Sequence, residues 1–443
     1  MNMIPATPSP ASTMAHGTGE APASTKMIEV ELTEPLPAVG HDVPGGRLWV
    51  LARLASEPVG VCVLRPDTGL TPDQLGEMLW AELATPVACR FTAAGLAAPD
   101  GLPGAGLPAH SGLGLADMAS AAPFISVVVC TRDRPARLEV CLGYLARQDY
   151  PSFEVLVIDN VPSGDTVRKL VEARAGEAVT FRYVAEHRPG LSWARNTGVA
   201  AAAADLIAFL DDDDEPDSRW LSGVARGFAR GDDVGCVTGM TLASRLETRA
   251  QELFEELGGH STGRGFTPTV FTRKGPQNPI FPRPPFGAGA NMAFRRQALE
   301  RIGGFDVALG AGTPTCMGED TLAFTLVLLA GYRLAYEPSA LMRHSHRRDM
   351  DGLREQLHGL NTGVLAYYTA LLRHRPSALA GLLRLLPSAF DYLRTGRHLS
   401  AAPAEADLPG DLTRLNIKAV LAGPWAYLTS MRRQARVAAE ARR

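Results

Sequence analysis

The stretch FISVVVC at residues 124–130 is a continuous apolar run of strand length, and apolar residues at helical spacing follow it from Pro135 to Leu145. Three later runs have the same character: FEVLVID (153–159), VTFRYV (179–184) and DLIAFL (205–210). Helical stretches at 165–175 and 191–203 separate them. Because buried apolar strands that alternate with helices are typical of parallel sheets covered on both faces, the sequence predicts an α/β fold with a doubly wound, mostly parallel sheet.

The rest of the chain is expected to form separate segments around this core, because 443 residues exceed one ordinary hydrophobic core. A helix is predicted to open with Thr71 as its N-cap and Pro72 at its first position. The expected segments are a disordered tail (1–26), a small α+β domain of unknown role (27–95), a Gly-, Ala- and Pro-rich linker (96–122), the sheet domain (123–350) and a helical C-terminal extension (351–443).

Composition narrows the class of protein. A net charge of -3 argues against nucleic acid as a partner, and six cysteines without a C-x-x-C pair are expected to be free thiols in a reducing compartment. The N-terminus lacks the features of a secretory signal, and no stretch of 18 apolar residues occurs, so we expect a cytoplasmic protein. The basic, amphipathic segment 412–436 fits either packing on the protein or peripheral contact with a membrane.

Polar residues follow the predicted strands at the edge where doubly wound sheets bind ligands. They are Thr131 and Arg132 after the first strand, Asp159 and Asn160 after the second, and Asp211 to Asp214 after the fourth. Four adjacent carboxylates repel one another unless a cation lies among them, and Mg²⁺ and Mn²⁺ prefer oxygen ligands. The run therefore indicates a divalent-metal site that can hold a diphosphate, although a solvated acidic turn fits the same letters.

Other nucleotide and metal motifs are absent. An EF-hand that begins at Asp211 would place Pro216 where glycine is required, and no Gly-rich dinucleotide or P-loop motif occurs in the chain.

A series of eight motifs follows in a fixed order: ISVVVCTRDRP (125–135), VLVIDN (155–160), RPGLSWARNTG (188–198), FLDDDDEPD (209–217), GAGANMAFRR (287–296), GGFD (303–306), GED (318–320) and a final H-S-H (344–346). In this order and spacing, the series resembles the family 2 inverting glycosyltransferases of GT-A fold. The resemblance covers about half of the chain. It implies a metal-dependent transfer of a sugar from a nucleotide-sugar donor, most commonly a UDP-sugar, to an acceptor hydroxyl. The acceptor would be a glycan, a lipid-linked molecule or a small molecule.

The resemblance also assigns roles to single residues. The donor nucleotide would contact Thr131, Arg132, Asp159, Gly190, Arg195, Asn196, Asp211 and Asp212. Divalent Mn²⁺ or Mg²⁺ would be bound by Asp213, Asp211 and His344. Asp320 would act as the general base with Glu319 in support, and Gly289 and Asn291 would contact the transferred sugar or the acceptor.

Each of these motifs has a plainer interpretation when taken alone. Glu319 and Asp320 are ordinary residues for a first helical turn, the GAGAN segment fits a simple bulge, and His344 fits an exposed basic patch. The processive Q-x-x-R-W motif is absent, which favours single additions over polymerisation. A nucleotidyltransferase and a catalytically silent nucleotide-sugar-binding or scaffold protein are the alternatives.

Overall fold

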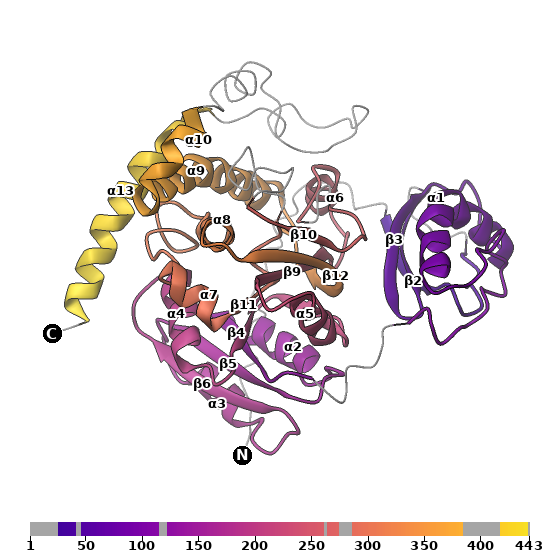
Figure 1. Ribbon diagram of the computed structural model, residues 1–443, viewed down its shortest axis with the longest axis horizontal. Coiled ribbons are helices and arrows are strands. Elements are labelled where there is room, and N and C mark those ends of the chain that lie inside the picture. Colours follow the sequence, from indigo (N-terminus) through magenta and orange to yellow (C-terminus); the bar gives the residue numbers. More distant parts are fainter. Residues whose placement is uncertain are drawn as a thin grey trace, which may run out of the picture.

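The computed structural model describes residues 25–40, 46–114, 122–260, 264–273, 286–383 and 417–441. Its centre is a nine-stranded mixed sheet with the strand order β10-β12-β9-β11-β7-β4-β5-β6, with β8 paired to β12 outside this path (Figure 1). The strands are β4 (Ile125–Thr131), β5 (Phe153–Asn160), β6 (Thr180–Glu186), β7 (Leu206–Asp211), β8 (Asp214–Pro216), β9 (Val234–Ala243), β10 (Thr269–Phe271), β11 (Met292–Arg295) and β12 (Arg333–His344).

Strands β4 to β7 are parallel to one another. The continuous apolar sequences of β4, β5 and β7 are explained by burial on both faces, whereas β6 is a partly exposed edge strand. Side chains of a strand alternate between faces, and β4 follows this rule, since Val127 and Val129 belong to one core cluster and Val128 and Cys130 to the other. Helices cover both faces, so the predicted α/β class and doubly wound arrangement are confirmed. One face carries α2 (Pro135–Leu145), α3 (Thr166–Glu172) and α5 (Trp220–Ala229), and the other carries α4 (Leu191–Ala201), α7 (Arg296–Ile302) and α8 (Glu319–Leu329).

The small N-terminal unit is a three-stranded sheet covered on one face by α1 (Figure 1). Its elements are β1 (Thr25–Glu31), β2 (Arg47–Leu54), β3 (Glu57–Leu64) and α1 (Pro72–Ala93). Helix α1 begins as predicted, because Thr71 caps it and forms a capping box with Gln74. The predicted tail lies outside the described residues apart from its last two, which begin β1.

The segment predicted as a linker is instead part of the N-terminal unit over its described residues 96–114. Leu102, Leu107 and Leu113 are buried in the same core cluster as the inner face of α1. A Cβ at Gly76 would lie 2.2 Å from the carbonyl oxygen of Leu102, so the segment packs directly on the helix. The density of glycine and proline is typical of a linker, but scattered leucines are enough to bury such a segment.

The C-terminal region is helical, as expected. Helix α9 (Met350–His374) is followed by a short 3₁₀ turn (Pro376–Ala378) and α10 (Leu379–Leu383), and α13 (Ile417–Glu440) packs along α9 (Figure 1). Gly423 permits the close crossing, since a Cβ there would lie 2.6 Å from the carbonyl oxygen of Thr362. Helix α6 (Arg249–Glu256) contacts the other end of α9. No helix among the described residues has both the length and the apolarity needed to cross a membrane.

Candidate active site

The polar residues singled out in the sequence meet at the carboxyl ends of β4, β5 and β7. The acidic run begins at the last residue of β7 and continues into β8, which pairs with the end of β12. Thr131, the last residue of β4, donates a 2.7 Å hydrogen bond from its hydroxyl to Asp212. Burial raises the pKa of Asp212 to about 6, against the effect of that bond. Parallel pairing of β4 with β7 therefore joins the first predicted loop to the acidic run.

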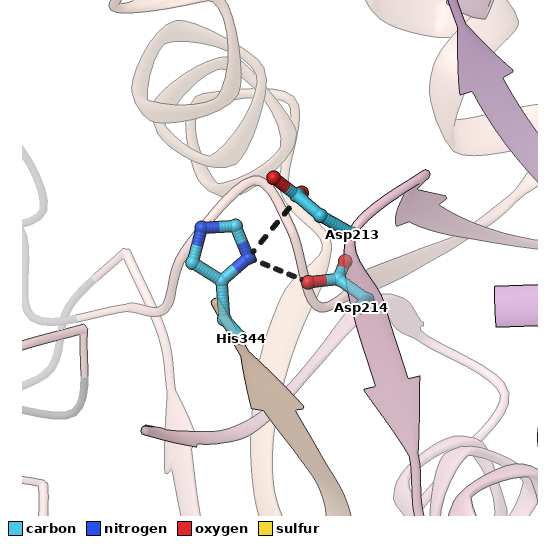
Figure 2. A group of neighbouring side chains, drawn as sticks. All are labelled: Asp213, Asp214 and His344. Atoms are coloured by element: carbon cyan, nitrogen blue, oxygen red, sulfur yellow. Dashed lines mark hydrogen bonds and ion pairs between the residues drawn. The ribbon is translucent and has the colours of Figure 1, made fainter. Parts of the chain in front are cut away.

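Asp213, Asp214 and His344 form the one group in the described residues whose ligand atoms lie close enough to hold a metal ion, within 4.8 Å of one another (Figure 2). Nδ1 of His344 lies 2.6 Å from Asp214 and 3.8 Å from Asp213. Burial by itself would lower the pKa of His344, but the hydrogen bond and the charge of Asp214 raise it to about 9. Two carboxylates and an imidazole at this spacing match the ligands of Mn²⁺ and Mg²⁺ sites.

This group differs from the predicted ligand set, in which Asp211 stood where the structure has Asp214. The side chain of Asp211 instead contacts Arg195, while its backbone N–H donates a 2.8 Å hydrogen bond to Asp214. Asp214 reaches His344 because β8 and β12 pair in a register that places the two residues opposite each other. The four consecutive aspartates marked the region, but nothing in the sequence distinguished Asp214 from its neighbours.

Arg195 links three of the predicted motifs. Its buried guanidinium donates hydrogen bonds of 2.7 Å to Glu319 and 3.1 Å to the carbonyl oxygen of Gly289, and it lies 3.5 Å from Asp211. Burial and the neighbouring charge of Asp320 raise the pKa of Glu319 to about 7, and Arg195 opposes that shift. One cation thus holds the acidic run, the GED helix and the GAGAN segment together.

Asp320 is partly exposed at the first turn of α8, beside the GAGAN segment. Its Oδ1 accepts hydrogen bonds from the backbone N–H and the hydroxyl of Thr321, at 2.6 and 3.1 Å. Its Oδ2 lies so near Gly289 that a Cβ added there would be 2.8 Å away. The carboxylate is therefore fixed on one side by its own helix and on the other by bare backbone.

The predicted nucleotide side is organised around the end of β5. Asp159 is buried and accepts a 3.1 Å hydrogen bond from the hydroxyl of Tyr183, and burial raises its pKa. Asn160 accepts a 3.0 Å bond from the backbone N–H of Gly190, which has a φ of +130° in the turn before α4. Glycine is favoured there because other residues rarely adopt that conformation. Arg132 is exposed on the β4–α2 loop.

Two predicted contact residues are used by the fold itself. Asn291 is buried; its side chain donates to the carbonyl oxygens of Met240 and Ala340 and accepts from the indole of Trp220, so it has no group left for a sugar. Asn196 likewise bonds both the N–H and the carbonyl oxygen of Phe305. Both amides thus hold strands and loops in place.

Two arginines that no sequence motif singled out lie against the acidic run: Arg134 at the end of the β4–α2 loop and Arg137 in the first turn of α2. Arg137 forms a 2.6 Å ion pair with Asp213, and Arg134 lies 3.3 Å from Asp212. Both side chains are nearly half exposed and border an open depression of about 310 Å³ lined by residues 133–137. The TRDRPAR segment thus supplies positive charge beside the carboxylates, which suits an anionic ligand.

An α/β fold with an acidic, His-bearing edge, a buried Arg–Glu pair and arginines beside it defines a class of site that suits a metal ion and an anionic ligand. Comparison with known proteins agrees with this class: residues 126–303 match the family model described as glycosyl transferase family 2. This part of the chain belongs to glycosyltransferase family 2, as the sequence motifs predicted.

Curated relatives are similar over the same region. The pre-mycofactocin glycosyltransferase of Mycobacterium tuberculosis is 30% identical over 169 residues, which are 37% of this chain and 32% of the relative. The validoxylamine A glucosyltransferase of Streptomyces hygroscopicus is 41% identical over 93 residues, 20% of this chain and 22% of the relative. The chain thus spans a third or less of the length of these two relatives.

Among solved structures, the mannosyltransferase PcManGT from Pyrobaculum calidifontis, in complex with GDP-Man and Mn²⁺, aligns with a TM-score of 0.41 at 22% identity. The alignment covers 72% of this chain and 76% of that structure.

Proposed function

We propose that this chain is a metal-dependent inverting glycosyltransferase that moves a sugar from a nucleotide-sugar donor to an acceptor hydroxyl in single additions. The observation that carries the proposal is the link made by Arg195, which holds Glu319 and the acidic run on one edge of the sheet beside Asp320. Family membership of the same residues supports it, and the family resemblance favours a UDP-sugar as donor. Hexosyl or N-acetylhexosaminyl transfer is the expected chemistry.

The group that would hold Mn²⁺ or Mg²⁺ is Asp213, Asp214 and His344. Its fit to the ion rests on the donor set, since two carboxylates and an imidazole converge from β12 and the β7–β8 segment. A bound divalent ion would offset the negative charge of a diphosphate leaving group. Arg134 and Arg137 lie where they can pair with the same phosphates.

In the proposed mechanism, Asp320 accepts the proton of the acceptor hydroxyl as its oxygen forms a bond to the anomeric carbon. The bond from that carbon to the diphosphate oxygen breaks on the opposite face, so the configuration inverts. Arg195 keeps the neighbouring Glu319 paired, which limits the negative charge around Asp320. Gly289 leaves space for the carboxylate against the backbone.

The roles of two carboxylates can be separated by substitution. Asp320→Asn keeps the shape but removes the base, so we expect transfer to be abolished while nucleotide binding stays near that of the unmodified protein. Asp213→Ala is expected to weaken metal-dependent donor binding instead. Near-normal turnover of the Asn variant would show that the base assignment is wrong.

The first experiment is isothermal titration of the full chain with UDP and with GDP, each with and without Mn²⁺. Metal-dependent binding of UDP supports the proposal, and preference for GDP changes the donor class. No binding by a folded sample would favour a catalytically silent scaffold, and a nucleotidyltransferase would be revealed by nucleoside triphosphate turnover.

We also propose peripheral contact with an anionic membrane through the outer face of α13. The inner face packs on α9, whereas Leu421 and Trp425 are 65% and 68% exposed, with Ile417 and Leu428 on the same side. Arg432, Arg433 and Arg436 follow, and Glu440 is the only acidic residue of this helix. Apolar residues next to clustered arginines suit the interface of an anionic bilayer.

Vesicle co-sedimentation tests this contact. Binding to phosphatidylglycerol vesicles, little binding to phosphatidylcholine vesicles and loss of binding in Leu421→Ser/Trp425→Ser are expected. Val140→Ser, which changes an exposed apolar residue on α2, is the control. Equal sedimentation with both lipids would overturn the proposal. A dimer of the unmodified protein that dissociates in the double variant would overturn it as well.

A further inference from the structure

The small N-terminal domain lies against the strands that carry the metal-binding group. The sheet face opposite α1 contributes Trp49 and Leu51 to the main core cluster of the chain, and β3 contacts β12. The two units therefore share buried apolar surface. No role for this domain follows from the sequence or from the family match, which begins at residue 126.

A chain of charged side chains crosses this interface. Arg53, on β2, is only 9% exposed and forms a 2.5 Å ion pair with Asp217 of the sheet domain. Arg53 also pairs with Glu29 on β1, and Glu29 pairs with Arg343 on β12. The charges alternate in sign in the order Asp217, Arg53, Glu29, Arg343. The buried guanidinium of Arg53 is therefore compensated by a carboxylate on each side.

The two ends of this chain of charges are next to metal-site residues. Asp217 directly follows β8, which begins with Asp214, and Arg343 directly precedes His344 on β12. The backbone N–H of Asp217 donates a 3.0 Å hydrogen bond to the carbonyl oxygen of Leu341, which extends the pairing of β8 with β12. The N-terminal domain thus holds both strands of the β8–β12 ribbon, the antiparallel pair that carries Asp214 and His344.

A second pair of contacts reaches the other flank of the site. Arg47 forms a 2.7 Å ion pair with Glu256, and Thr25 bonds Glu252, both on α6. The same helix carries Glu255, whose carboxylate lies 2.6 Å from Nε2 of buried His346, two residues beyond His344. The segment that contains His344 is therefore held by N-terminal contacts on both sides.

We propose that the N-terminal domain is a positioning element of the metal site, with Arg53 as its principal positioning residue. This inference rests on the proposed metal-binding function of Asp213, Asp214 and His344. The domain fixes the spacing of β8 and β12, and so the distance between the carboxylates and the imidazole. Metal ligands held in this way bind more tightly because less ordering is needed on binding.

Arg53→Ala tests the proposal, with Glu57→Gln as the matched control. Glu57 forms a 3.4 Å ion pair with Arg226 of α5 across the same interface and has no ion pair with Asp217 or Arg343 among the described residues. We expect Arg53→Ala to weaken Mn²⁺ binding, measured by electron paramagnetic resonance, by about 10-fold or more, as is usual when residues that orient metal ligands are lost. Arg53→Lys is expected to restore part of the affinity, and Glu57→Gln is expected to leave it unchanged.

Amide hydrogen exchange gives a readout that needs no metal. Exchange in residues 211–217 and 341–346 is expected to accelerate in Arg53→Ala, whereas exchange in β4 stays slow. Unchanged exchange in the ribbon, or equal acceleration throughout the chain, would overturn the positioning role. Failure of the unmodified protein to bind Mn²⁺ would refute the proposed metal function, and the exchange result would still decide whether Arg53 orders the ribbon.

Discussion

Asn291 provides the sharpest test of how this site is built, because its side chain satisfies three buried groups at once. It bonds the carbonyl oxygens of Met240 and Ala340 at 2.8 Å each and the indole N–H of Trp220 at 2.9 Å. Asn291→Ala would leave all three without their partner at a site that is 1% exposed. Each lost bond contributes about 1 kcal/mol, and each orphaned group adds a desolvation cost, so we expect unfolding free energy to fall by about 3–5 kcal/mol.

Urea denaturation followed by near-ultraviolet circular dichroism measures this loss. Trp220→Phe removes only one of the three bonds, so a smaller loss is expected. The double variant is expected to be more stable than the sum of the single losses predicts, by about 1 kcal/mol, because the bond between the two residues can be lost only once. A loss below about 1 kcal/mol in Asn291→Ala, combined with a large rise in KM for the acceptor, would refute the structural role and return Asn291 to the binding site.

Two further predictions concern single side chains. Gly289→Ala places a methyl group 2.8 Å from Oδ2 of Asp320, so kcat is expected to fall by about 10- to 100-fold with nucleotide affinity retained. The control is Gly143→Ala on α2, where the new Cβ would make only an ordinary 3.7 Å contact with the end of the Arg147 side chain, and an unchanged kcat in Gly289→Ala would contradict the packing argument. Burial raises the pKa of Glu57 to about 7, above its value in the unfolded chain, so its contribution to stability is full at low pH and is lost as the pH rises from about 4.5 to 7. Glu57→Gln is therefore expected to flatten the dependence of unfolding free energy on pH and to be more stable than the unmodified protein at pH 8 by up to about 3 kcal/mol. Equal slopes for the two proteins in denaturation from pH 4 to 8 would contradict this prediction.

The half of the sheet formed by β4 to β7 could be predicted from the sequence because β4, β5 and β7 are buried on both faces and therefore have continuous apolar sequences. The mixed half, formed by β8 to β12, could not. Strand β11 has four residues, too few to show a period, yet it lies between β7 and β9 and joins the two halves. The leucines of residues 96–114 gave no regular spacing either, so burial of that segment depended on contacts with α1 that only the folded chain shows.

Residue types predicted the site better than they predicted the role of each residue. The acidic run was identified because four adjacent carboxylates are costly without a cation, whereas the GED triplet and His344 were identified through the family resemblance. Asp214 was missed because its contact with His344 joins positions 130 residues apart through strand pairing. The backbone contacts of Asn196 and Asn291 could not be predicted, because an amide that binds a sugar and an amide that binds backbone look the same in a sequence.

The position of Arg195 explains why these motifs depend on one another. A buried guanidinium is stable only with negative partners, and here they come from β7, from α8 and from the carbonyl oxygen of Gly289. Loss of Arg195 would leave Glu319 and Asp320 as adjacent carboxylates without a buried counter-charge, which favours protonation of one of them. The charge state of the proposed base, Asp320, therefore depends on Arg195, a residue that need not touch the acceptor. The RPGLSWARNTG and GED motifs are far apart in the sequence but form a single electrostatic unit in the fold.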